Sequence, residues 1–162
     1  MSGVSEVGRE TPSPGLVAAW VVMDTLRAES VPMWAAEWLV AGYDGEVLAE
    51  LAGLSGRDSR EVRDLLPAAL EDAGVEPLSS MRAALKVAYD HIAGMYLSGR
   101  VPWWWAVNET QALVIANGYV SEVFEQPMGD LWAIDDELGE PWARSEAELD
   151  DVVRRICVAQ MG

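Results

Sequence analysis

The chain has little of the residue types on which most catalytic sites depend. It contains one histidine, one cysteine and one lysine among its 162 residues. His91 stands alone beside Asp90, and Cys157 falls on an apolar helical pattern, which is typical of a buried structural cysteine. The spacings that mark zinc proteases, di-iron proteins and EF-hands do not occur. The sequence therefore predicts a protein that is not an enzyme and that holds no metal or cofactor.

Other features that the sequence lacks bear on the cellular compartment in which the protein acts. A single cysteine excludes a disulfide within the chain, so an oxidising compartment is not required. The first fifteen residues are acidic and have no apolar run of the kind found in a signal peptide. The longest apolar stretch, residues 15–23, is too short to span a bilayer. These features predict a cytoplasmic protein that does not interact with membranes.

What the chain does have is apolar residues, tryptophan and acidic charge. Hydrophobic residues make up 51% of the sequence, eight residues are tryptophan, and the formal net charge is −16. This hydrophobic fraction is sufficient for a folded core, so the chain is not of the disordered class. Nucleic-acid affinity depends largely on Lys and Arg, so a sequence pI near 4.2 argues against nucleic-acid binding.

Apolar residues recur at helical spacing along most of the chain. The pattern predicts a first helix over about 15–28, and Asp58 and Ser145 each stand three residues before a Glu in a capping-box arrangement. Other predicted helices end at glycine or asparagine, namely at Gly42, Gly53, Gly74, Gly99 and about Asn117. We expect a flexible tail over residues 1–13 and one all-α domain over residues 14–162, a bundle of about six or seven helices. Little or no β structure is expected, and any strand would lie near residues 100–107 or 119–126.

Acidic residues concentrate in the last third of the chain. Residues 122–151 contain eleven acids against Arg144 alone, so this segment carries −10 of the total −16. Such a density of like charge favours a basic partner, although a solvated face would give the same composition. The acidic residues predicted to bind a partner are Asp130, Asp135, Asp136, Glu137 and Glu140.

Three consecutive tryptophans, Trp103, Trp104 and Trp105, form the second candidate site. They lie in a segment, residues 100–107, without a helical period, which we expect to be a loop or a short extended piece. Three adjacent side chains cannot share one face of a helix or strand, so at least one tryptophan is expected to be partly exposed and to act as a binding anchor. The alternative is a tryptophan cluster that fills the core. Trp34 and Trp38, four residues apart, are expected in the core.

Residues 46–66 resemble a degenerate helix-turn-helix. Arg57, Arg60 and Arg63 would lie on the second helix, but Asp58, Glu61 and Asp64 cancel their charge and the turn is too long. DNA binding through this segment is therefore the second alternative function.

The stretch from Trp34 to Gly45, together with the leucine patterns that follow over residues 48–53 and 62–70, resembles small uncharacterised helical proteins of actinobacteria. The acidic, tryptophan-rich composition also resembles the immunity proteins of bacterial toxin systems. Neither resemblance implies a particular functional residue. The function we predict is a non-enzymatic module that binds a basic protein partner, in the manner of an immunity or antitoxin-type inhibitor. The first alternative is a small-molecule sensor or carrier with an aromatic-lined pocket, and the oligomeric state is left open.

Overall fold

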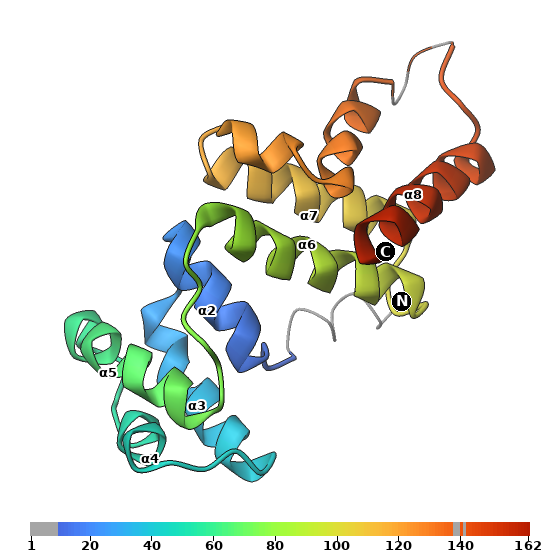
Figure 1. Cartoon of the computed structure of the whole chain (residues 1–162). Helices are drawn as coiled ribbons and strands as arrows, with labels where there is room; N and C mark the ends of the chain where they lie inside the picture. Colours follow the sequence, from blue (N-terminus) through green and yellow to red (C-terminus); the bar gives the residue numbers. More distant parts are fainter. Residues whose placement is uncertain (1–9, 138–139, 141) are drawn as a thin grey trace. The chain divides into compact units, whose positions relative to one another are not determined.

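A computed structural model describes residues 10–137, 140 and 142–162, apart from the side chains of residues 135–137. In this part of the chain every regular element is helical and no strand occurs, so the predicted all-α fold is confirmed (Figure 1). Seven α-helices and three 3₁₀-helices are present there, slightly more segments than predicted. The segments that sequence reasoning left as possible strands, 100–107 and 119–126, contain helical residues instead.

The chain folds as two compact units. The N-terminal unit consists of residues 11–84, and the C-terminal unit contains Glu10 and residues 85–162. Within the C-terminal unit, Arg100 forms an ion pair with Glu10. The single domain expected over residues 14–162 and the tail over 1–13 stay predictions, and residues 1–9 of that tail lie outside the described residues.

The N-terminal unit is built from α2 (Pro14–Met23), η1 (Ala28–Ser30), α3 (Val31–Val40), α4 (Glu46–Ala52) and α5 (Ser59–Asp72). Ser13 caps α2 by accepting a hydrogen bond from the Leu16 amide at 3.1 Å. The helix expected over 15–28 is too long as predicted, because Asp24 takes a left-handed conformation (φ 55°) and its N–H bonds back to the helix. The residues beyond this break form the separate turn η1.

Apolar side chains from these helices form the core of the N-terminal unit. Val17, Val31, Leu48, Leu51 and Val62 are completely buried. Trp38 is also buried, as predicted, and its indole N–H donates to the Pro12 carbonyl oxygen at 2.8 Å. Trp34 is half-buried and packs against the core, with its ring centroid 5.6 Å from that of Trp20.

The N-terminus of α4 is capped from a distant part of the chain. Gly45, the residue before the helix, has no side chain that could cap it, and the cap is supplied by Asp72 at the end of α5. Its Oδ2 accepts hydrogen bonds from the amides of Val47 at 2.9 Å and Leu48 at 3.1 Å. A Cβ at position 45 would lie 2.3 Å from the Asp72 side chain, so glycine permits this approach. The carboxylate also interacts favourably with the positive end of the helix dipole.

The C-terminal unit contains α6 (Met81–Leu97) from residue 85 onward, together with α7 (Trp103–Ala116), η2 (Ser121–Phe124), η3 (Pro127–Glu137) and α8 (Glu146–Met161). Helix α8 begins with a complete capping box between Ser145 and Glu148, as predicted. Both α7 and α8 pack against η3. None of the helices in the described ranges combines the length and the apolar character that crossing a membrane requires.

Candidate functional site

The three consecutive tryptophans form the first turn of α7. The prediction of a loop or extended piece over 100–107 was therefore wrong, because Pro102 is the N-cap of a helix that begins at Trp103. The helical period was hidden because tryptophan occupies all three opening positions. Successive helical side chains point in different directions, so Trp103 and Trp105 are half-buried while Trp104 is 44% exposed. The prediction that at least one is partly exposed is confirmed.

The predicted acidic site is described only in part. Asp130 is exposed on η3, and Glu140 is exposed in the segment that follows. The side chains of Asp135, Asp136 and Glu137 lie outside what the structure describes, so their grouping with Asp130 stays a prediction.

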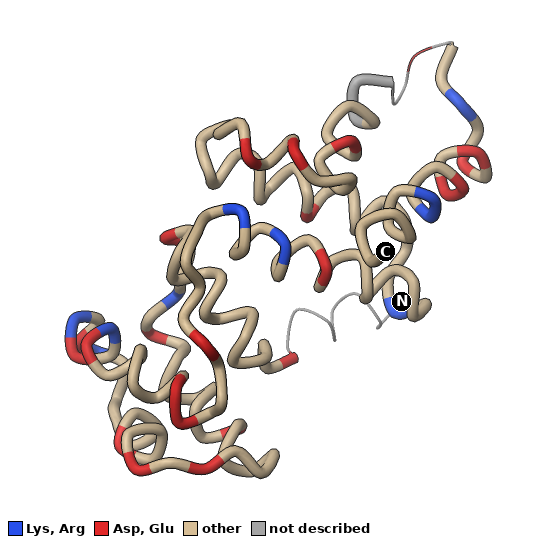
Figure 2. The backbone as a smooth tube through the Cα atoms, viewed as in Figure 1, with Lys and Arg blue, Asp and Glu red and all other residues tan. Residues whose placement is uncertain are grey.

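Residues 101–143 contain eight acids and no Lys or Arg. We call this segment the base-free stretch. Figure 2 shows acidic positions along α7, η2 and η3 without a basic position between them. The exposed aromatic side chains of the described C-terminal unit all lie on this stretch, and they are Trp104, Tyr119, Phe124 and Trp142. Exposed aromatic rings therefore occur on a segment that carries acidic residues and no basic ones.

The end of α7 fixes the position of one of these rings. The Gly118 amide donates to the Ile115 carbonyl and the Tyr119 amide to the Val114 carbonyl, which are the two bonds of a Schellman motif. Gly118 and Tyr119 both have positive φ, 65° and 60°. This conformation is uncommon for a bulky residue. The Tyr119 ring makes a T-shaped contact with Trp132 of η3, with 5.4 Å between the ring centroids.

The backbones of η2 and η3 approach each other closely at Gly129. A Cβ at this position would lie 2.4 Å from the Val123 carbonyl oxygen and 2.8 Å from the Phe124 Cα. The same Val123 oxygen accepts a hydrogen bond of 2.7 Å from the buried hydroxyl of Tyr89, and burial raises the pKa of that phenol. The segment η2 is therefore fixed on two sides, by the Tyr89 hydroxyl of α6 and by the backbone of η3 at Gly129.

A buried glutamine fixes the start of η3. The Gln160 side chain on α8 is 4% exposed. Its Oε1 accepts from the Met128 amide at 3.2 Å, and its Nε2 donates to Asp90 Oδ1 and Gln126 Oε1, both at 2.9 Å. Because buried polar groups need partners, this network selects one position for η3. Sequence reasoning missed it, although a glutamine three residues after Cys157 on an apolar stripe was an available signal.

Tyr96 and Asp150 form a second polar contact, between α6 and α8. The Tyr96 hydroxyl donates to the Asp150 carbonyl oxygen at 3.1 Å and also bonds to the Asp150 carboxylate. Burial, followed by the bond to Asp150, raises the pKa of Tyr96 to about 12. The Arg154 guanidinium lies over the ring, 5.3 Å from its centroid. These interactions join α6 and α8.

Cys157 is buried, as predicted, with its sulfur 3.7 Å from the Met128 sulfur. Burial raises the pKa of this thiol to about 11. Folding therefore favours the protonated thiol, and this contribution to stability is complete below the unfolded pKa near 9 and is lost as the pH rises through 11.

We expect the Cys157 thiol of the native protein to react very slowly with an aromatic disulfide reagent at about pH 8, because it is both buried and protonated. The same protein unfolded in urea should react within the mixing time. Following the released thiolate by absorbance makes this comparison. Fast labelling of the native protein would contradict the placement of Cys157 in the core.

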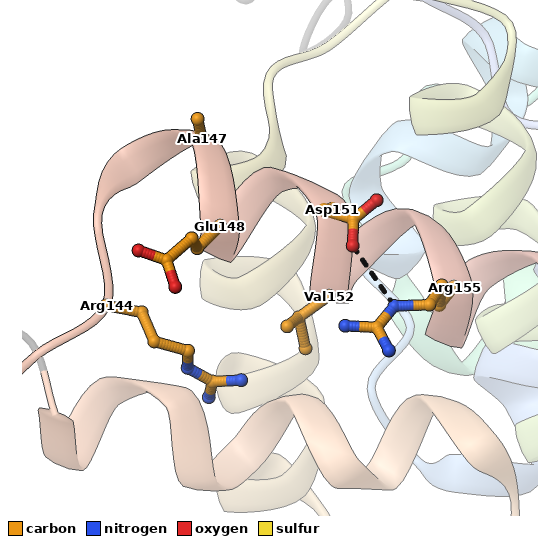
Figure 3. A pocket seen from close by; sticks show the side chains of 6 residues that line it. All are labelled: Arg144, Ala147, Glu148, Asp151, Val152 and Arg155. Atoms are coloured by element: carbon orange, nitrogen blue, oxygen red, sulfur yellow. Dashed lines mark ion pairs between the residues drawn. The ribbon is translucent and has the colours of Figure 1, made fainter.

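A hollow of about 390 Å³ lies along the first turns of α8 (Figure 3). The Asp151 carboxylate and the Arg155 guanidinium form an ion pair there, with 3.2 Å between Oδ2 and Nε. The hollow is lined by Arg144, Ala147, Glu148, Asp151, Val152 and Arg155. It has no aromatic lining, so it does not supply the pocket that the sensor or carrier hypothesis requires.

No group of three or more His, Cys, Asp or Glu side chains suited to a metal ion occurs among the residues whose placement is described. His91 is exposed on α6.

The helix-turn-helix candidate is formed by α4 and α5. Residues 53–58 separate the two helices, a longer connection than the three or four residues of a DNA-binding helix-turn-helix. Arg57, Arg60 and Arg63 are exposed, and Glu61 and Asp64 are exposed on the same helix, α5. Arg63 also donates to the Leu26 carbonyl oxygen at 3.4 Å. DNA binding therefore stays a hypothesis, and the long connection between α4 and α5 does not favour it.

Comparison with known proteins found no matching protein-family model, no matching curated protein and no matching solved structure.

Proposed function

We propose that this chain is a non-enzymatic interaction protein that binds a basic protein partner through the base-free stretch of its C-terminal unit. The observation that supports this proposal most directly is that exposed aromatic rings lie on a segment with eight acids and no Lys or Arg. Charged groups steer a partner of opposite sign towards a surface, and exposed aromatic side chains supply the contacts that hold it there.

The predicted residues enter the proposal with distinct roles. Trp104, the exposed member of the run Trp103–Trp105, would be one anchor. Asp130 and Glu140 would attract the partner, together with the acids at 135–137. An immunity or antitoxin-type inhibitor acting in a bacterial cytoplasm is the most concrete form of this function.

The proposal is tested by purifying the tagged protein from its source organism at low salt and washing with high salt. We expect a basic protein to be retained and then released, because the attraction between exposed charges is screened by salt. Mass spectrometry identifies the protein, and a titration with the purified components gives its affinity.

A quadruple neutral variant, Asp130→Asn with Asp135→Asn, Asp136→Asn and Glu137→Gln, should lower that affinity by at least about tenfold. The matched control neutralises four exposed acids of the N-terminal unit, namely Glu37, Glu50, Asp64 and Glu71. Equal affinities for the two variants, or the absence of any basic partner, would overturn the proposed function.

A further inference from the structure

Three aromatic residues lie on or next to η3, and we call them the aromatic surface: Tyr119, Phe124 and Trp132. In a 3₁₀-helix, residues three apart share a face, so Gly129 and Trp132 lie on the same side of η3. The Phe124 backbone packs against Gly129, and the Tyr119 ring packs against Trp132. Three elements that follow one another along the chain thus bring these residues together.

Two of these rings are unusually open to solvent. Tyr119 is 54% exposed and Phe124 is 44% exposed, while Trp132 is half-buried and in contact with the Tyr119 ring. Isolated exposed apolar residues are ordinary on a protein surface, but grouped aromatic rings with a polar rim mark interaction sites. The Schellman motif, the Tyr89 hydroxyl and the Gln160 network hold the backbone beneath the rings.

The rim of the aromatic surface is acidic. Glu122 lies on η2 between Tyr119 and Phe124 in the chain, and its carboxylate accepts a hydrogen bond of 2.8 Å from Ser121 Oγ. Asp130 is exposed on η3, one residue after Gly129. The segment that contains Glu122 and Asp130 carries no Lys or Arg, so the chemistry of the rim favours a cation.

We propose that the aromatic surface binds an amphipathic segment of a protein partner that presents arginine or lysine beside apolar side chains. The apolar side chains cover Phe124 and Trp132. A guanidinium or ammonium group lies over the exposed Tyr119 ring, where the π electrons and the carboxylates of Glu122 and Asp130 both attract it. Phosphate-rich nucleic acid and anionic membranes are repelled by the same rim. This inference rests on the proposed function and specifies where, and with what chemistry, the partner binds.

The experiment uses the full-length protein and a fluorescein-labelled synthetic peptide, an amphipathic helix with leucine on one face and arginine on the other. Fluorescence anisotropy at low salt gives its affinity, and a second peptide with glutamate in place of arginine reports charge selection. We expect the arginine peptide to bind and the glutamate peptide not to bind.

The double variant Tyr119→Gly with Phe124→Ala removes both exposed rings. Glycine is chosen at position 119 because it adopts the observed positive φ without steric cost, so the turn keeps its conformation. We expect the affinity for the arginine peptide to fall at least about tenfold. The matched control is Tyr43→Ala, which removes an exposed aromatic ring of the N-terminal unit and should bind the peptide as the native protein does.

The competing outcomes are separable. Unchanged peptide affinity in the double variant, or binding of both peptides alike, overturns the aromatic surface as the site. Failure of the native protein to bind the arginine peptide overturns it as well. In each of these cases the proposed function is judged independently, by whether a basic protein co-purifies and is released by salt. Circular dichroism of the double variant confirms that a loss of binding is not a loss of fold.

Discussion

Replacing Gly129 by alanine is expected to lower the free energy of unfolding by about 3 kcal/mol, the upper part of the range for overpacking. The added Cβ would lie 2.4 Å from the Val123 carbonyl oxygen and 2.8 Å from the Phe124 Cα. Both neighbours are backbone atoms and cannot rotate away, so η2 and η3 must separate. Urea unfolding followed by circular dichroism measures the change.

Gly94 provides a matched control for this prediction. It lies inside α6, and no heavy atom would come within 4 Å of an added Cβ. Gly94→Ala should therefore stabilise the protein by roughly 0.5–1 kcal/mol, since alanine loses less backbone entropy in a helix. We therefore expect Gly129→Ala to lower the free energy of unfolding and Gly94→Ala to raise it. A Gly129→Ala protein as stable as the native one would show that η2 and η3 are not in close contact.

Replacing Trp38 by alanine is expected to lower the free energy of unfolding by about 3–5 kcal/mol. The indole is 3% exposed, so its removal loses apolar burial and leaves a cavity among the core side chains. The Pro12 carbonyl oxygen also loses the N–H donor that lies 2.8 Å from it. The same urea titration measures the effect, provided that enough folded protein remains for a baseline.

Trp142 is the matched control for the core substitution. Its side chain is 67% exposed, so Trp142→Ala should change the free energy of unfolding by no more than about 0.5 kcal/mol. The loss of unfolding free energy for Trp38→Phe should lie between those for Trp38→Ala and Trp142→Ala, because phenylalanine keeps an aromatic ring but lacks the indole donor. A small effect of Trp38→Ala would contradict the core packing of the N-terminal unit.

Local signals in the sequence were sufficient to predict the all-α class and most helix boundaries. Asp58 and Ser145 accept hydrogen bonds from the first-turn amides as their spacing indicated. Each of these features depends on residues only a few positions apart, and so a sequence pattern can carry it.

Features that depend on distant residues could not be predicted in this way. Asp72 caps α4 across 25 positions, and Gln160 reaches Asp90 across 70. Residues 127–137 form a 3₁₀-helix whose period differs from the α-helical one, so their apolar residues gave no clear pattern.

The candidate site was predicted only in part, for a related reason. Trp104 and Asp130 were named from the sequence and are exposed. Nothing in the sequence singled out Tyr119 and Phe124, because large aromatic residues are often buried. Their exposure follows from the Schellman turn and from the contact at Gly129, which are properties of the folded chain.

The long span of the Gln160 bonds has a consequence for the order in which the chain folds. Contacts of the N-terminal unit, such as Trp38 with Pro12 and Asp72 with Val47, close loops of 26 and 25 positions. Those that complete the C-terminal unit close loops of 54 and 70 positions, between Tyr96 and Asp150 and between Asp90 and Gln160. Longer loops cost more entropy and slow folding. During synthesis on a ribosome, residues 11–84 can form their native contacts before Gln160, which fixes the start of η3, has been added to the chain.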